Sequence, residues 1–357
     1  MDKKDLTKDE KNTLGKIRKI VSDAKKQSLT SYCLICGKPC TKFCNSHTVP
    51  EFVLRNSAVD GHVMSSIVNL NFIPVDDIIR GVKKSGIIHR ICSECDNTIF
   101  KNYENPSSLL QKPSNHILNS IALKTTLNNY SKKLDENKFL EYTQANEISI
   151  PFERYHDIDK REIKNTLNGL IKTLNGKKNI NNKLVFWQKL NYVVPIACQV
   201  SLVLSGDLSG HVINNIFDTD SHHKMQPLYI GIFPLEKSSV VMLFHSLSDN
   251  NYNAFDSQFL KLNLTEQLEL ISYMVLLYTE EYFLSPKLQT VLDDDSNEEV
   301  QLLLEAAQDM HMDIIYNELT KREYENREMV KLKNRKPIAN FLGKKFAMSN
   351  LTSSSAQ

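Results

Sequence analysis

The chain of 357 residues is long enough for two or three domains, and 41% of its residues are hydrophobic, enough for a substantial core. The formal net charge of +2 is small, so overall charge neither requires nor excludes a nucleic-acid partner. The N-terminus lacks the apolar segment of a signal peptide, and no run approaches the roughly 18 apolar residues of a membrane-spanning helix. These features predict a globular, cytoplasmic protein with no membrane partner.

The first 28 residues carry nine Lys or Arg against five acidic residues. Leu14, Ile17, Ile20 and Val21 recur at helical spacing, which predicts a short amphipathic helix with a basic face. This helix could pack on the next domain, or it could act as an arm that contacts DNA.

Two Cys-x-x-Cys pairs, Cys33 with Cys36 and Cys92 with Cys95, dominate the next part of the chain. An odd total of seven cysteines with this spacing favours thiolate metal ligands in a reducing compartment over disulfides. Gly37 follows the first pair and permits the tight turn of a zinc knuckle. We therefore expect a structural Zn²⁺ bound by these four cysteines, with two short antiparallel strands and a helix that starts at the second pair.

The other three cysteines have less certain roles. Cys40 and Cys44 could replace one pair as ligands, form a second site, or occupy strand positions as small hydrophobic residues. Cys198 lies in an apolar segment and is expected in the core.

A long insertion between Glu51 and Arg90 ends in a basic sequence. It could form a solvated hairpin, or its cations could neutralise phosphates and so position the protein on nucleic acid. The candidate phosphate-binding residues are Arg80, Lys83, Lys84 and Arg90.

The rest of the chain predicts alternating helical and strand segments. Helices are expected at residues 114–134, 159–174, 264–282 (with Thr265 as N-cap) and 297–319, and three or four antiparallel strands follow residue 183. The predicted regions are a basic helix (1–28), a zinc finger domain (29–112), a helical connector (113–182), an α+β domain (183–320) and a basic, partly disordered tail (321–357). The fold class is α+β.

The cysteine block has a recognisable pattern: CLICGK, then SHTVPEF, then ICSECDNTIF. This pattern resembles the HNH endonuclease family, whose ββα-metal fingers carry a structural zinc. The resemblance covers about one fifth of the chain, residues 33–104. It implies a treble-clef-like zinc finger at the N-terminus, and it implies metal-dependent hydrolysis of phosphodiester bonds in nucleic acid, with DNA favoured and genome defence as a possible setting.

The resemblance also assigns roles to residues of this block. His47 would be the general base, a role that suits imidazole because its pKa lies near neutrality. Asp96 and Asn97 would hold a catalytic Mg²⁺ or Mn²⁺, which prefers oxygen ligands. Ser46 stands where the family has an acidic ligand, and His89, Glu51 or Glu104 could supply the missing one.

Two other functional hypotheses remain open. The first is a zinc module that binds nucleic acid or a protein without catalysis, and the C-terminal region could bind such a protein partner. The second is an enzyme whose site lies in the C-terminal sheet. A loop there contains His211, His222 and His223 with Asp218 and Asp220, and could be a second metal cluster or a solvated loop.

Overall fold

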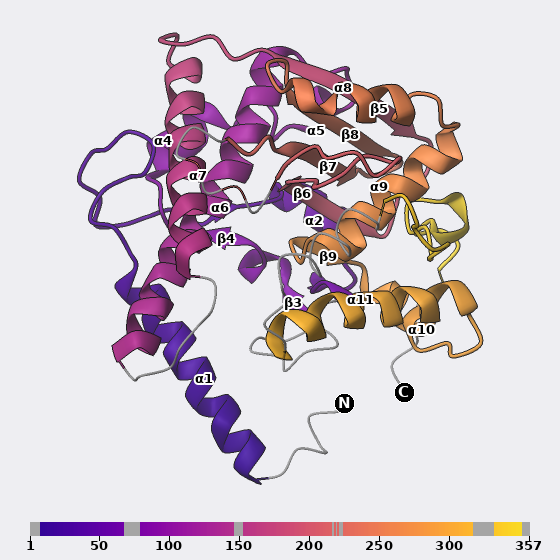
Figure 1. The fold of residues 1–357 in the computed structure, drawn as a ribbon, viewed down its shortest axis with the longest axis horizontal. Helices are drawn as coiled ribbons and strands as arrows, with labels where there is room; N and C mark the ends of the chain where they lie inside the picture. The colour runs from indigo at the N-terminus through magenta and orange to yellow at the C-terminus, as the bar shows by residue number, and fades with distance from the viewer. Residues whose placement is uncertain are drawn as a thin grey trace.

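The structure is a computed structural model that describes residues 8–67, 79–145, 153–215, 218, 220, 224–316 and 332–351. It combines helices with antiparallel strands, as the sequence predicts (Figure 1). One large sheet lies at its centre, and helices pack against both of its faces.

The N-terminal third contains mostly short elements. They are α1 (Lys8–Gln27), β1 (Ser46–His47), α2 (Glu51–Ser57), β2 (His62–Met64), β3 (Ile79–Gly81), the 3₁₀ turn η1 (Val82–Lys84), β4 (Ile87–Ile88), α4 (Ser93–Ile99) and α5 (Pro106–Leu109). β1 and β4 pair antiparallel, with Ser46 opposite Ile88 and His47 opposite Ile87. The predicted pair of short strands followed by a helix is therefore present.

Longer elements make up the rest. They are α6 (Asn115–Ala145), α7 (Glu153–Leu174), β5 (Asn182–Leu190), β6 (Ile196–Leu202), β7 (Leu228–Pro234), β8 (Ser239–Ser246), η2 (Asn250–Tyr252), α8 (Asn253–Phe259), α9 (Leu264–Tyr278), β9 (Tyr282–Leu284), η3 (Pro286–Leu288), α10 (Gln289–Leu292), α11 (Glu298–Tyr316) and η4 (Lys344–Phe346). The seven-stranded sheet has the order β3-β2-β9-β6-β7-β8-β5, and every neighbouring pair of strands in it is antiparallel.

Alternation along the central strands gives the sheet two buried faces. In β7, Leu228, Ile230 and Ile232 belong to one hydrophobic core, whereas Tyr229 and Phe233 belong to the other. Successive strand residues point to opposite faces, so a strand that is apolar at nearly every position is expected to be covered on both sides.

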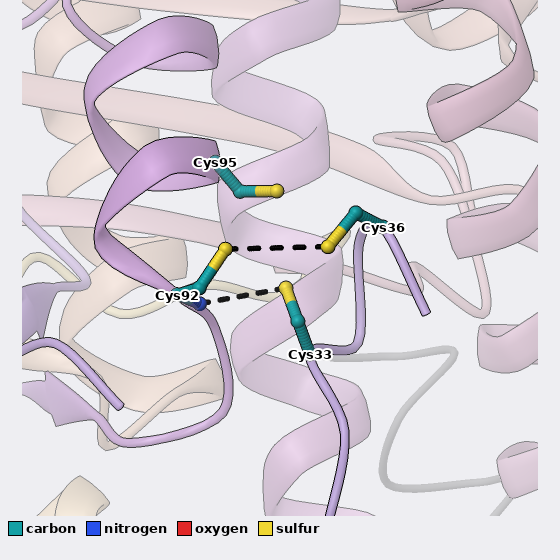
Figure 2. Close-up of side chains that lie close together, drawn as sticks. All are labelled: Cys33, Cys36, Cys92 and Cys95. Atoms are coloured by element: carbon teal, nitrogen blue, oxygen red, sulfur yellow. Dashed lines mark hydrogen bonds between the residues drawn. The ribbon is translucent and has the colours of Figure 1, made fainter. Parts of the chain in front are cut away.

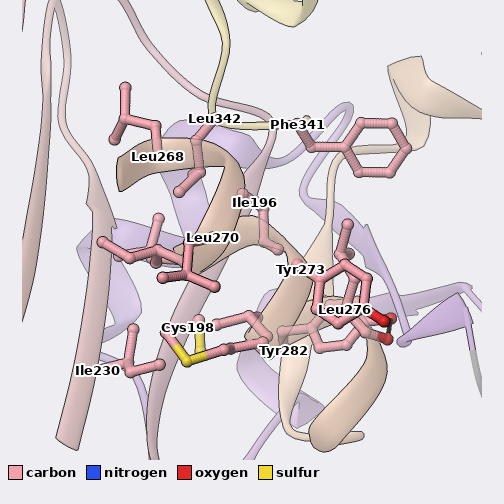
Figure 3. Packing of buried hydrophobic residues seen from close by; sticks show 14 of the residues in the cluster. Ile196, Cys198, Ile230, Leu268, Leu270, Tyr273, Leu276, Tyr282, Phe341 and Leu342 are labelled. Carbon is pink, nitrogen blue, oxygen red and sulfur yellow. Dashed lines mark hydrogen bonds between the residues drawn. The ribbon is translucent and has the colours of Figure 1, made fainter. Parts of the chain in front are cut away.

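Helices α8, α9 and α11 contribute to the first core (Figure 1). Figure 3 shows residues of α9 packed against strand residues Ile196, Cys198 and Ile230. A capping box fixes the start of α9: the Asn263 side chain accepts from the Glu266 N–H, and the Glu266 carboxylate accepts from the Asn263 N–H. Asn263, and not the predicted Thr265, is the N-cap.

Three helix boundaries differ by more than one residue from those predicted. α6 extends to Ala145 and α7 begins at Glu153, both beyond the expected ranges. α9 ends at Tyr278, and the chain then returns to the sheet as β9. The predicted helix at 297–319 is observed as α11, and residues 317–319 lie outside the described residues.

The cysteine block is not a separate packing unit. Its residues share the second core with α6, α7 and one face of the sheet. β2 and β3, both inside the predicted finger domain, form one edge of the large sheet, where Met64 pairs with Leu284. The second core therefore includes residues on both sides of the predicted domain boundaries at 112 and 182.

The predicted basic tail is partly buried. Phe341 and Leu342 have no exposed surface, Phe346 is also buried, and all three belong to the first core (Figure 3). Residues 321–331 and 352–357 of that tail lie outside the described residues. The charge of the surrounding lysines led to the prediction of a solvated tail, whereas these apolar residues attach the tail to the core.

Candidate metal centre and the residues around it

The first cysteine pair sits in a tight turn. The Gly37 N–H donates to the Cys33 carbonyl (2.9 Å), and the Cys33 N–H donates to the Lys38 carbonyl (2.9 Å). Gly37 has φ of +71°, a conformation that glycine adopts without steric cost. The predicted knuckle turn is therefore present.

The second pair lies at the start of α4, where Cys92 is the N-cap residue and Cys95 is in the first turn. The main chain joins this region to the knuckle, because the Leu34 N–H donates to the Arg90 carbonyl (3.0 Å). The Cys92 N–H also donates to Cys33 Sγ (3.4 Å). Two segments far apart in sequence are thus brought together.

The four thiols converge in one place (Figure 2). The sulfur atoms of Cys33, Cys36, Cys92 and Cys95 all lie within 4.8 Å of one another, and Cys36 Sγ is 4.0 Å from Cys92 Sγ. Zinc–sulfur bonds of about 2.3 Å in a tetrahedron separate neighbouring sulfurs by about 3.8 Å. The donor set and its spacing therefore fit a metal ion such as Zn²⁺.

Burial would oppose free thiolates at this site. It is the main cause that raises the pKa of Cys95, and the neighbouring thiols Cys92, Cys33 and Cys36 raise it further. A metal cation reverses this preference because it binds and stabilises thiolates.

The remaining cysteines lie outside this cluster. Cys40 Sγ donates to the Lys42 carbonyl and Cys44 Sγ to the Ile91 carbonyl, each at 3.3 Å. Burial and the nearby Asp96 carboxylate raise the pKa of Cys44 to about 12, so this thiol stays protonated. Cys198 is fully buried in β6, as predicted.

His47 lies in β1, half-buried. Its Nε2 is 3.2 Å from the Val82 carbonyl oxygen, which can only accept, so Nε2 carries the proton. The other nitrogen, Nδ1, has no hydrogen-bond partner among the described residues. Burial lowers the pKa of His47, outweighing the opposing effects of that carbonyl and Glu51, so the ring is neutral at pH 7. A neutral imidazole with a fixed tautomer and an unoccupied lone pair can accept a proton.

Cations flank the same carbonyl. Val82 begins the turn η1, and the next two residues, Lys83 and Lys84, are exposed. Arg80, in the adjacent strand β3, is partly exposed. The turn that orients His47 therefore carries two of the predicted phosphate-binding residues.

Arg90 has a different role from the one predicted. Its side chain is 3% exposed, forms an ion pair with Asp135, and donates to Ser28 Oγ (2.6 Å) and Ser131 Oγ (3.1 Å). It links the end of α1 to α6 and to the segment before Cys92. A guanidinium buried in this way is not positioned to contact phosphate, so the structure contradicts this prediction.

Asp96 contacts a buried ammonium. Lys124 of α6 is 1% exposed, and its Nζ donates to Ser46 Oγ (2.6 Å) and Asp96 Oδ1 (3.1 Å) and pairs with Glu104 Oε1 (2.9 Å). The Ser46 hydroxyl in turn donates to Asp96 Oδ1 (2.6 Å). The Lys124 ammonium also lies 4.0 Å from the centroid of the Phe100 ring.

This arrangement does not fit a divalent ion at Asp96. The oxygens of Ser46, Asp96 and Glu104, which could act as hard ligands, surround an ammonium instead. Asn97 is exposed on α4, with no hydrogen bond to His47 among the described residues. Ser46 and His47 are consecutive strand residues, so their side chains point to opposite faces and Asp96 lies on the side away from His47.

Lys124 is not among the residues predicted for the site. Its only signal is a lysine that directly follows the apolar run Ile121–Leu123 in α6. A lysine placed among residues at core spacing requires a buried acidic partner, and the sequence alone does not identify which of the acidic residues it is.

Among the described residues, the histidines of the C-terminal loop do not form a cluster. His211 is exposed and lies 3.4 Å from Asp207, while His222 and His223 lie outside the described residues. Among the described residues, the four cysteines form the only cluster of three or more metal-binding side chains.

Comparisons of the chain with protein-family models, curated proteins and solved structures found no match in any of the three. None of the described helices is both long and apolar enough to cross a membrane. Function must therefore be inferred from the geometry of the site.

Proposed function

We propose that this protein is a nuclease that hydrolyses phosphodiester bonds, with DNA as the favoured substrate, His47 as general base, and a ββα zinc finger as the scaffold of the site. The observation that carries the proposal is the contact between His47 Nε2 and the Val82 carbonyl. It leaves Nδ1 as a proton acceptor beside a basic turn.

In this mechanism, His47 Nδ1 takes a proton from the attacking water as the water oxygen bonds to phosphorus. The bond from phosphorus to the leaving sugar oxygen breaks, and that oxygen takes a proton from solvent water. Lys83 and Lys84 neutralise the negative charge that grows on the phosphate oxygens. The zinc bound by the four cysteines keeps β1, β4 and α4 in register and takes no part in the reaction. A divalent ion at Asp96 takes no part in this mechanism, because the Lys124 ammonium already contacts that carboxylate.

A non-catalytic zinc module is the second candidate. It is favoured by the contacts that Asp96 makes with Ser46 and Lys124, which leave that carboxylate engaged within the protein. In this case Lys83 and Lys84 would bind nucleic acid that is not cleaved.

One assay separates the two functions. Supercoiled plasmid, single-stranded DNA and RNA would be incubated with wild type, His47→Ala and the control His62→Ala, in EDTA, Mg²⁺ or Mn²⁺. His62 is an exposed histidine of β2 whose Nδ1 contacts the Asp60 carbonyl. It pairs with Gly81, directly before the η1 turn, so this control tests whether loss of any histidine near that turn has the same effect. The nuclease proposal predicts cleavage that His47→Ala reduces by at least about 100-fold and His62→Ala leaves intact.

Binding without cleavage by the folded wild type, under all three metal conditions, would refute the nuclease and support the second candidate. Cleavage that persists in His47→Ala would show that the base lies elsewhere. Cleavage that requires Mg²⁺ or Mn²⁺ would show that a divalent ion binds at the site despite Lys124.

A further inference from the structure

A second polar site lies beside α7, where β5 begins and β8 ends. A cleft of about 830 Å³ is bounded by α7, by residues 178–182 and by residues 246–249, which follow β8. Clefts of about 300–1,000 Å³ commonly hold small-molecule ligands. None of the predicted nuclease residues lines it.

Asp249 is the most informative residue of this cleft. It is 3% exposed, and its Oδ2 has no hydrogen-bond partner among the described residues. The other oxygen, Oδ1, has only long contacts, at 3.5 Å to Ser248 Oγ and 3.9 Å to Lys224 Nζ. Burial raises the pKa of this carboxyl, although Lys224 and His245 oppose the rise. A buried acceptor of this kind is stabilised by a donor, which a ligand can supply.

Glu162 provides a second such acceptor. Its Oε2 accepts from the Met225 N–H (3.0 Å), whereas its Oε1 is buried without a partner in the described part of the chain. Lys224 Nζ lies 3.9 Å from Asp249, and the next residue, Met225, donates its N–H to Glu162. Both carboxylates therefore lie beside one short segment. Within the described residues, the cleft therefore contains two carboxylate oxygens without a hydrogen-bond donor.

Cations lie around the same cleft. Arg161, Lys178 and Lys224 all line it and are exposed. Ala122, Leu170 and Tyr229 supply an apolar part of the wall, and Tyr229 is held in place by stacking on Phe244. The lining therefore combines buried acceptors, an apolar surface and a positively charged rim.

This combination narrows the class of ligand. A metal ion alone does not account for it, because no cluster of three metal-binding side chains lies there among the described residues. Inorganic phosphate would meet the cations but would leave the apolar part of the wall uncovered. A nucleotide supplies all three complements: N–H donors and a flat apolar face on its base, and negative charge on its phosphate.

We propose that this cleft binds a nucleotide, with the base N–H groups on Asp249 and Glu162 and the phosphate on the cations of the rim. The site is independent of the proposed nuclease chemistry.

The test is calorimetric titration of the full chain with the four nucleoside 5′-monophosphates, the corresponding nucleosides, ribose 5-phosphate and inorganic phosphate. At least one nucleotide should bind, and ribose 5-phosphate and phosphate should bind at least about tenfold more weakly, because they lack the base with its N–H donors and its flat apolar face. Asp249→Asn and Glu162→Gln should each weaken nucleotide binding about tenfold or more. Lys224→Gln should weaken binding of the nucleotide but not of the corresponding nucleoside.

The matched control is Asp294→Asn, an exposed aspartate outside the cleft, which should bind like wild type. Circular dichroism would establish that each variant is folded, and Glu162→Gln serves if Asp249→Asn is not. The proposal is overturned if no nucleotide binds, if ribose 5-phosphate binds as tightly as the nucleotides, or if folded carboxylate variants bind unchanged.

Discussion

The cysteine block and the C-terminal sheet are stabilised in different ways. In residues 33–104 the paired strands β1 and β4 have two residues each, and the block adds a few specific contacts to its share of the second core: the four thiols, the Lys124 cluster and Arg90. In the sheet, β5 to β8 have seven to nine residues each, and stability is spread over many apolar side chains. Single substitutions should therefore have sharp local effects in the block and graded effects in the sheet.

Removal of a metal ligand should give the largest effect. Cys92→Ser should abolish stoichiometric zinc and unfold much of the block, since zinc contributes about 10–16 kcal/mol to the folding of small zinc-finger peptides. Metal analysis and amide hydrogen exchange would measure both outcomes. The control is Cys198→Ala, a buried cysteine outside the cluster, which should keep its zinc. If folded Cys92→Ser retained stoichiometric zinc, the cysteine block would not depend on this ligand.

Loss of the buried ammonium should come next. Lys124→Met leaves Asp96 and Glu104 partly buried without their cation, at a cost of about 3–5 kcal/mol in the free energy of unfolding. Urea denaturation would measure it, with Lys38→Met as control. Lys38 pairs with Glu94 at the surface, and such a pair contributes about 0–1 kcal/mol. Equal losses in the two variants would show that the cluster is not a major contact.

A helix cap in the sheet region should give a moderate effect. Asn263→Ala removes the side chain that accepts from the Glu266 N–H and should cost about 1 kcal/mol. Thr265→Ala is the control, because the sequence favoured Thr265 as the cap and the structure does not. A larger loss for Thr265→Ala in thermal or urea unfolding would contradict the observed start of α9.

The pH dependence of stability should give the smallest effect. Burial lowers the folded-state pKa of His47 below its usual 6.5. Lys124 lowers this pKa further, whereas the Val82 carbonyl, Glu51 and Glu104 raise it without cancelling the effect of burial. The unfolded chain then binds more protons than the folded chain, so stability is lost as pH falls below about 6.5. His47→Gln removes this contribution and should lose less stability than wild type between pH 7 and pH 5.5. Urea unfolding at several pH values would measure this difference. If the free energy of unfolding fell equally with pH in wild type and His47→Gln, the pKa of His47 would not be lowered in the folded protein.

Sequence patterns predicted some features well for physical reasons. Cys-x-x-Cys spacing followed by glycine constrains the local geometry of a metal knuckle, and the observed turn at Gly37 agrees with it. The strands from residue 182 were found because β-branched and aromatic residues persist across runs bounded by turns.

Other features depend on distant contacts and leave little trace in the sequence. Arg90 was placed with the phosphate-binding cations because its burial depends on Asp135, 45 positions away. Lys124 was overlooked because its partners lie in three separate segments. The joining of β2 to β9 arises from pairing across more than 200 residues, which no local periodicity encodes.

The central claim is that four thiolates hold one metal ion that ties the knuckle to α4. Zinc X-ray absorption of the purified chain tests it most directly. The structure predicts a first shell of four sulfur atoms at about 2.3 Å. A shell with nitrogen or oxygen ligands, or protein purified folded without stoichiometric metal, would contradict it.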